Sequence, residues 1–146
     1  MSESIVVGTD GSATAKRAVA EAARLARALG AELHLVSAYD PFRSLAAASA
    51  TGYVMPAVVE DDEAEVRSLL AEEAAEIDGE HLRVQTHAVL GSPADALVEV
   101  ANKLGASLIV VGNQGMHGAK RVLGSVPNSV SHKARCNVLI VSTDAP

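Results

Sequence analysis

Three short runs of this chain are almost continuously apolar and rich in β-branched residues, and they restrict the folds open to it. These runs are Ile5–Val7, Leu108–Val111 and Val138–Val141. A strand of this composition has no polar face, so both of its faces must be covered, as in a parallel sheet between layers of helices. Ala31–Tyr39 and Arg83–Leu90 are also predicted to be strands. We therefore expect five strands.

Apolar residues at helical spacing separate each strand from the next. Every connection is long enough to hold a helix, which predicts parallel pairing throughout and an α/β fold. The segment Asp40–Val59 lacks a clear pattern and is expected to be a mobile loop or lid, or a helical turn around Leu45–Ala50. The expected helices end at Gly30, run from the acidic stretch Glu60–Glu63 to Gly79, run from the N-cap Ser92 and Pro93 to Gly105, and span Ser125–Ala134.

Size and composition predict one domain, residues 1–146, and exclude several partners. The formal net charge of -6 disfavours nucleic acid and anionic membranes. Two Tyr, one Phe and no Trp leave little aromatic surface for stacking bases of a single strand. No apolar run approaches the ~20 residues that span a bilayer. The N-terminus lacks the features of a signal peptide, and Cys136 is the only cysteine, so we expect a cytoplasmic protein without disulfides.

Two loops that follow strands are candidates for ligand binding, because parallel α/β sheets bind ligands beyond the carboxyl ends of their strands. One is Gly8–Ser12, and the other is Gly112–Ser125, which holds four glycines and leads into the last helix. Glycines let backbone amides approach an anion, and a helix N-terminus favours negative charge. Ser125 would add a hydroxyl at the N-cap, and His117, Lys120 and Arg121 would add positive charge. The long loop is therefore predicted to bind phosphate, unless its glycines only shape a surface connection.

Asp10 ends the first strand, where a carboxylate can accept hydrogen bonds from ribose hydroxyls. The alternative is an Asp-Gly turn ahead of a helix. An adenine ring would need an apolar slot, which residues near Ala38 and Tyr39 are expected to supply. The two loops and this slot together predict a mononucleotide site.

Other chemistries have little support in the sequence. The first loop matches neither the Walker motif of NTPases nor the glycine pattern of dinucleotide sites. Ser125 and His132 lie two helical turns apart, too far to act as a catalytic pair, so we expect no catalytic residues. His34 and His87 lie in neighbouring expected strands, but two histidines without a further ligand make a weak metal site, and burial or a hydrogen bond is the expected role.

The chain as a whole resembles the universal stress protein family. The resemblance rests on Val7–Ser12, on the order of strands and helices, and on Val110–Gly115 followed by Gly124–Val126. In the nucleotide-binding branch of this family, nine residues separate the second glycine of the late motif from the Gly-Ser pair, whereas eight do so here, Met116–Leu123. This difference leaves the choice among ATP, AMP and a cyclic nucleotide open.

The resemblance implies a flavodoxin-like open sheet of order 3-2-1-4-5 with helices on both faces, and a dimer formed through the last strand. That strand would be an apolar edge that needs a partner. The resemblance also implies ribose contact from Asp10, phosphate contacts from the late glycines and Ser125, and adenine contacts near Gly8, Ala38 and Val126. The expected nucleotide-binding residues are Gly8, Thr9, Asp10, Ala38, Val111, Gly112, Gly115, Gly124, Ser125 and Val126.

Three functions follow from these expectations. The first is a stress-response module that binds ATP or a related adenine nucleotide and acts as a switch or sensor toward partner proteins, with at most slow hydrolysis. The second is a buffer for cyclic AMP, and the third is a dimeric scaffold without nucleotide. Magnesium would depend on the phosphate oxygens of the ligand.

Overall fold

The computed structural model describes residues 3–39, 57–77, 79, 81–113 and 124–142. In these ranges strands and helices alternate, as the sequence predicts. The strands are β1 (Ser4–Gly8), β2 (Glu32–Tyr39), β3 (Val84–Leu90), β4 (Leu108–Gly112) and β5 (Asn137–Val141), and the helices are α1 (Ala13–Leu29), α3 (Ala57–Ile77), α4 (Pro93–Leu104) and α5 (Ser125–Lys133).

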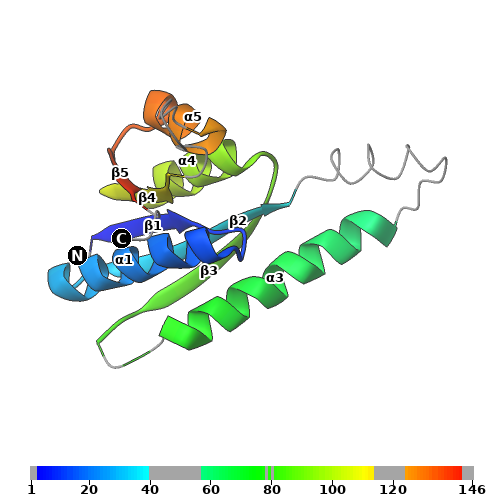
Figure 1. Cartoon of the computed structure of the whole chain (residues 1–146), viewed down its shortest axis with the longest axis horizontal. Coiled ribbons are helices and arrows are strands. Elements are labelled where there is room, and N and C mark those ends of the chain that lie inside the picture. Colours follow the sequence, from blue (N-terminus) through cyan, green and yellow to red (C-terminus); the bar gives the residue numbers. More distant parts are fainter. Residues whose placement is uncertain (1–2, 40–56, 78, 80, 114–123, 143–146) are drawn as a thin grey trace.

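The five strands form one parallel sheet in the order β3-β2-β1-β4-β5, which confirms the predicted topology. Helices α1 and α3 cover one face of this sheet, and α4 and α5 cover the other (Figure 1). The chain changes faces between β1 and β4, because α1 leaves β1 on one side and α5 leaves β4 on the other. This arrangement is the switch point at which open α/β sheets bind their ligands.

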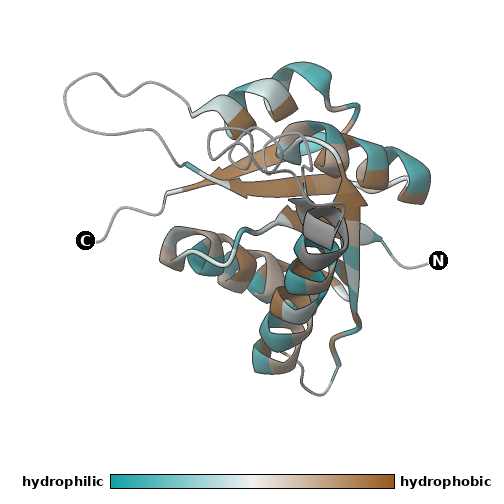
Figure 2. Cartoon of the chain, turned by 90° about the vertical axis from the view of Figure 1, so that its right-hand side faces the viewer, coloured by the Kyte–Doolittle hydropathy of each residue, from teal (hydrophilic) through white to brown (hydrophobic). Residues whose placement is uncertain are grey.

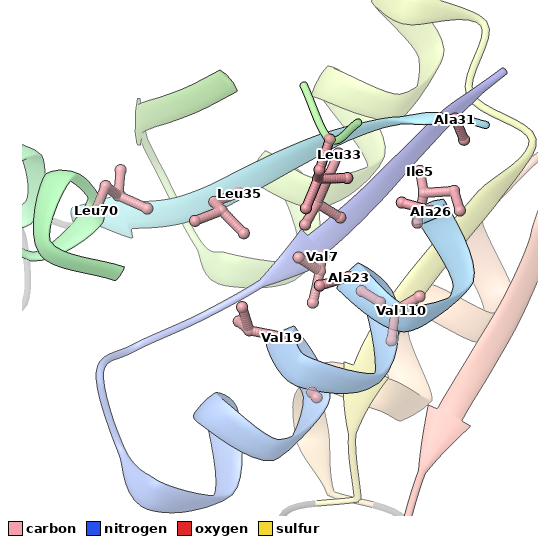
Figure 3. Packing of buried hydrophobic residues seen from close by; sticks show 13 residues of the cluster. Ile5, Val7, Val19, Ala23, Ala26, Ala31, Leu33, Leu35, Leu70 and Val110 are labelled. Atoms are coloured by element: carbon pink, nitrogen blue, oxygen red, sulfur yellow. The ribbon is translucent and has the colours of Figure 1, made fainter. Parts of the chain in front are cut away.

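The apolar runs form two cores because successive residues of a strand point to opposite faces. In β1, Ile5 and Val7 pack in the core under α1 and α3, while Val6 packs under α4. Figure 2 shows the apolar residues concentrated on the central strands and on the inner sides of the helices. In Figure 3, Val19 and Ala23 of α1 lie against these strand residues.

Several helix ends are stabilised by local capping. The Ser12 hydroxyl caps α1 by accepting a hydrogen bond from the backbone N–H of Ala15. Gly30 and Gly105 end α1 and α4 in the left-handed conformation, with φ of 66° and 60°. These glycines confirm the predicted ends of both helices.

Two boundaries differ from the predictions. Helix α3 begins at Ala57, before the acidic run that was expected to open it. Proline disfavours the helical conformation at the residue that precedes it, so Pro56 limits how early the helix can begin. The apolar residues after Pro56 can then join the helix ahead of the acidic run. The expected lid or helical turn within Asp40–Val59 lies, up to residue 56, outside the described residues. At α5, Gly124 is the N-cap and Ser125 is the first helical residue, so the expectation that Ser125 caps this helix was wrong.

No helix among the described residues is long and apolar enough to cross a lipid bilayer.

Candidate functional site

A cavity opens at the carboxyl ends of β1, β2 and β4, where the two layers of helices diverge. The β1–α1 segment lines it with Gly8, Thr9 and Asp10, and with Thr14 and Ala15 from the start of α1. The other walls come from the ends of β2 and β4 and from the N-terminal halves of α4 and α5. They consist of Val36, Ser37, Ala38, Pro93, Leu97, Val111, Gly112, Val126 and Pro127.

Most of the residues that the sequence predicts for a nucleotide site meet in this cavity. Gly124 and Ser125 are not part of its lining but directly precede Val126 at the start of α5. Gly115, and the charged residues expected beside it, lie outside the described residues. The predicted residues that line the cavity are Gly8, Thr9, Asp10, Ala38, Val111, Gly112 and Val126.

The floor of the cavity is apolar and closely packed. Leu97 of α4 lies directly over Gly8, and a Cβ on Gly8 would come within 2.9 Å of a Leu97 methyl carbon. The missing side chain at Gly8 therefore lets α4 approach the end of β1. An apolar slot of this kind suits a planar ring whose edge hydrogen-bonds with backbone groups.

Asp10 is exposed at the rim of the cavity and is held by a turn. Its Oδ1 atom accepts a hydrogen bond of 2.9 Å from the backbone N–H of Ser12. The Oδ2 atom has no hydrogen-bond partner among the residues that the structure describes. The turn and the ligand role are therefore compatible, because one oxygen orients the carboxylate and the other is available to a hydroxyl donor.

The first turn of α5 presents amides without an intrahelical partner at the same opening. The N–H groups of Ser125 and Val126 precede the first intrahelical donor, the Asn128 N–H that bonds to the Gly124 carbonyl. Pro127 has no N–H. The positive end of the helix dipole and two donors without intrahelical partners make this end of α5 suitable for an anion.

Sequence reasoning missed several residues of the cavity wall. Thr14 and Ser37 are the polar ones among them, and Ser37 is buried, with 7% of the residue exposed. Leu97 was not among the residues expected at the site, and Pro93 was expected only as a helix start. Their position next to predicted residues was the available signal, but the register of β2 and the phase of α4 decide which side chains reach the cavity.

The sequence also did not predict a buried contact behind the cavity. The Thr9 hydroxyl donates a hydrogen bond of 3.0 Å to the Glu73 carboxylate of α3, and the Gly11 N–H donates one of 3.2 Å to the Thr9 oxygen. Glu73 is 4% exposed. Burial raises the pKa of Glu73 above its ordinary value, while the Thr9 hydrogen bond and the charge of Lys16 act in the opposite direction.

His34 and His87 face each other on the α4 side of the sheet, as their predicted strands suggested. The Nδ1 atom of His34 lies 2.9 Å from the Nε2 atom of His87, a hydrogen-bond distance. Glu32 Oε2 is 3.8 Å from the other nitrogen of His34. Among the described residues, no group of three possible ligands surrounds a point that could hold a metal ion.

This histidine pair predicts a loss of stability in acid. Burial lowers the pKa of both histidines below the ordinary value of 6.5, and Glu32 only partly offsets this at His34. The unfolded chain therefore binds more protons than the folded chain once the pH falls below about 6.5, so the free energy of unfolding should decrease there. We expect the double variant His34→Leu/His87→Leu to flatten this decrease, measured as melting temperature from pH 8 to pH 5.

His132→Gln is the matched control, because His132 is exposed on α5. It should keep the acid sensitivity of the wild type. An unchanged slope in the double variant would assign the acid sensitivity to other groups.

Comparison with known proteins agrees with this architecture. The sequence profile of the universal stress protein family matches residues 1–142. Universal stress protein Rv1636 of Mycobacterium tuberculosis is 39% identical over 150 residues, which cover 97% of each chain. A relative in Methanocaldococcus jannaschii, universal stress protein MJ0531, is 32% identical over 142 residues, 94% of this chain and 80% of the relative.

Solved structures of universal stress proteins have the same fold. One in complex with cAMP is 35% identical and superposes with a TM-score of 0.69, covering 98% of both chains. Another, from Archaeoglobus fulgidus in complex with dAMP, is 25% identical with a TM-score of 0.69, covering 94% of this chain and 96% of the other.

Proposed function

Because the chain belongs to the universal stress protein family, we propose that it binds an adenine nucleotide in the cavity at the carboxyl edge of its sheet. The observation that carries the proposal is the convergence, at one opening, of an apolar slot, the Asp10 carboxylate and the amides at the start of α5. Each of these features suits a different part of a nucleotide: the base, the ribose and the phosphates.

In this proposal the adenine ring enters the slot between Ala38, Leu97 and Val126. The ribose hydroxyls donate to Asp10, and the phosphates lie over Gly112 and the first turn of α5, with Gly115 and Ser125 contributing as the resemblance implies. Magnesium, where present, would be held mainly by the phosphate oxygens. The ligands of the two solved relatives, cAMP and dAMP, have the adenine ring in common, which supports adenine as the recognised base.

We further propose that the bound nucleotide acts as a signal. The protein would be a cytoplasmic stress-response module whose occupancy changes the surface offered to partner proteins. The described site holds no serine or cysteine paired with a base, so the proposal does not include rapid catalysis. β5 pairs only with β4 among the described strands, and its apolar residues are half-buried, which favours a homodimer through this edge.

A cyclic AMP buffer is the second candidate, because a relative 35% identical to this chain was solved with cAMP. Calorimetry on nucleotide-free protein separates the two functions. Tighter binding of ATP than of cyclic AMP supports the switch, whereas far tighter binding of cyclic AMP supports the buffer.

Gly124→Asp tests the proposed phosphate position. Gly124 is the N-cap of α5 with φ of -60°, where aspartate is a favourable residue, so the variant should fold at least as well as the wild type. Its carboxylate would repel phosphates at this helix end, and we expect ATP binding about tenfold weaker, equivalent to about 1.4 kcal/mol. The readout is the rise in melting temperature with ATP, because a ligand that binds only the folded state must stabilise it.

Gly124→Asn is the matched control, since asparagine has the same size and capping ability without the charge. It should retain more ATP stabilisation than Gly124→Asp, and the difference should disappear with adenosine, which has no phosphate. Equal ATP binding by the two variants would remove the start of α5 from the phosphate site. A wild-type protein that no adenine nucleotide stabilises would overturn the proposed function.

A further inference from the structure

Glu73 is an unusual residue for the interior of this fold. It belongs to α3, outside the cavity, yet only 4% of it is exposed. Its Oε1 atom accepts the hydrogen bond from Thr9, and its Oε2 atom is buried without a hydrogen-bond partner in the described part of the chain. A buried carboxylate with one unsatisfied oxygen costs folding free energy.

The contact connects α3 to the loop that carries Asp10. The Gly11 N–H donates to the Thr9 hydroxyl, which in turn donates to Glu73, so the direction of both hydrogen bonds is set by an acceptor-only carboxylate. α3 also contacts the loop through Leu69, because a Cβ on Gly11 would clash with a Leu69 methyl carbon. Gly11 has φ of 82°, a conformation that favours glycine.

We propose that Glu73 is a positioning residue for the nucleotide site: through the Thr9 hydroxyl it holds the loop Gly8–Gly11 in the shape that binds the ligand. This inference rests on the proposed function, since the loop it positions is the one assigned to the nucleoside. It gives the site a connection to α3 that does not pass through the ligand.

Protonation of Glu73 should weaken this connection. A neutral carboxyl accepts a weaker hydrogen bond from the Thr9 hydroxyl than a carboxylate does, and a proton on Oε2 would have no hydrogen-bond partner among the described residues. The charged groups that act on Glu73 are Lys16 of α1, Asp10 of the loop and Glu76 of α3. The side chains that β2 and β3 direct toward α3 by strand alternation include no carboxylate and no basic group. They are Leu33, Leu35, Ser37, Tyr39, Val84, Thr86, Ala88 and Leu90.

Protonation of Glu73 should increase the stability of the ligand-free protein, although it weakens the contact with Thr9. Burial raises the pKa of Glu73, so the folded chain binds this proton more firmly than the unfolded chain does. Its favourable contribution is complete below the ordinary pKa of 4.5 and is lost as the pH rises through the raised pKa. At neutral pH, Glu73→Gln should therefore be at least as stable as the wild type.

The experiment compares ATP affinity by calorimetry at pH 7.5 for the wild type, Glu73→Gln, Thr9→Val and the double variant. Loss of the charge-assisted hydrogen bond should weaken binding by about tenfold in each single variant, and by no more than that in the double variant, because both remove the same contact. Between pH 7.5 and pH 5, affinity should fall more for the wild type than for Glu73→Gln. Glu76→Gln, an exposed carboxylate one turn away, is the matched control and should keep the ATP affinity of the wild type at pH 7.5.

The result expected is weaker binding by Glu73→Gln together with an undiminished melting temperature. A merely structural role predicts that both fall, and additive effects in the double variant, about a hundredfold, would also overturn the proposal. Amide hydrogen exchange of Gly11 in ligand-free protein gives an independent readout, faster in both single variants than in Glu76→Gln. If the wild type binds no ATP but this exchange difference is found, the proposed function fails and the contact itself stands.

Discussion

Ala38→Trp should abolish nucleotide binding while leaving the protein folded. Ala38 is half-buried at the end of β2 and lines the apolar slot, so an indole at this position would occupy the space proposed for the adenine ring. A ligand that must displace an attached ring loses most of its buried apolar contact. We expect affinity for ATP to fall by at least about a hundredfold, equivalent to about 2.7 kcal/mol.

Leu90→Trp is the control for this substitution. Leu90 is the register partner of Tyr39 at the end of β3, but it is 58% exposed and does not line the cavity. The affinity of Leu90→Trp for ATP should match that of the wild type. Calorimetry gives the affinities, and circular dichroism shows whether both variants keep the fold. Tight ATP binding by folded Ala38→Trp would exclude this slot as the base site.

Leu33→Ala should cause the largest loss of stability. Leu33 is fully buried at the centre of the core between β1, β2 and α1 (Figure 3). Removing such a side chain costs the transfer free energy of the lost carbons and leaves a cavity, about 3 kcal/mol in total. For a domain of this size, the melting temperature should fall by about 6 to 12 °C.

The matched substitution is Leu29→Ala at the end of α1, where the leucine is 58% exposed. Its melting temperature should change by no more than about 2 °C, since surface substitutions are usually within about 0.5 kcal/mol. Similar losses of melting temperature in the two variants would contradict the prediction that burial of Leu33 makes its removal more costly. Thermal unfolding of ligand-free protein provides the measurement.

Much of the fold could be predicted because the relevant signals are local. A run such as Leu108–Val111 has no polar side, and this alone requires cover on both faces. Gly30 and Gly105 mark helix ends because the left-handed conformation there is costly for other residues. The strand order itself was an expectation from the family resemblance, since strand patterns do not say which strands are neighbours.

The predicted start of α3 and the predicted N-cap of α5 were wrong because neighbouring residues can begin a helix at nearly the same free energy. Gly124 and Ser125 can both occupy the N-cap of a helix, and the structure uses the glycine. Likewise, the start of α3 depends on how many residues after Pro56 join the helix, and the apolar residues there allow an earlier start than the acidic run suggested.

By itself, the sequence determined the parallel sheet, the glycine ends of α1 and α4, and the placement of the Gly8–Ser12 loop and the end of the fourth strand at one edge of the sheet. It could do so because the carboxyl ends of parallel strands lie at one edge. Only the tertiary structure decided that Thr9 bonds to Glu73, 64 residues away, and that His34 bonds to His87, 53 residues away. Such contacts depend on strand register and on the rotation of a helix about its axis, which local periodicity leaves open within one or two residues.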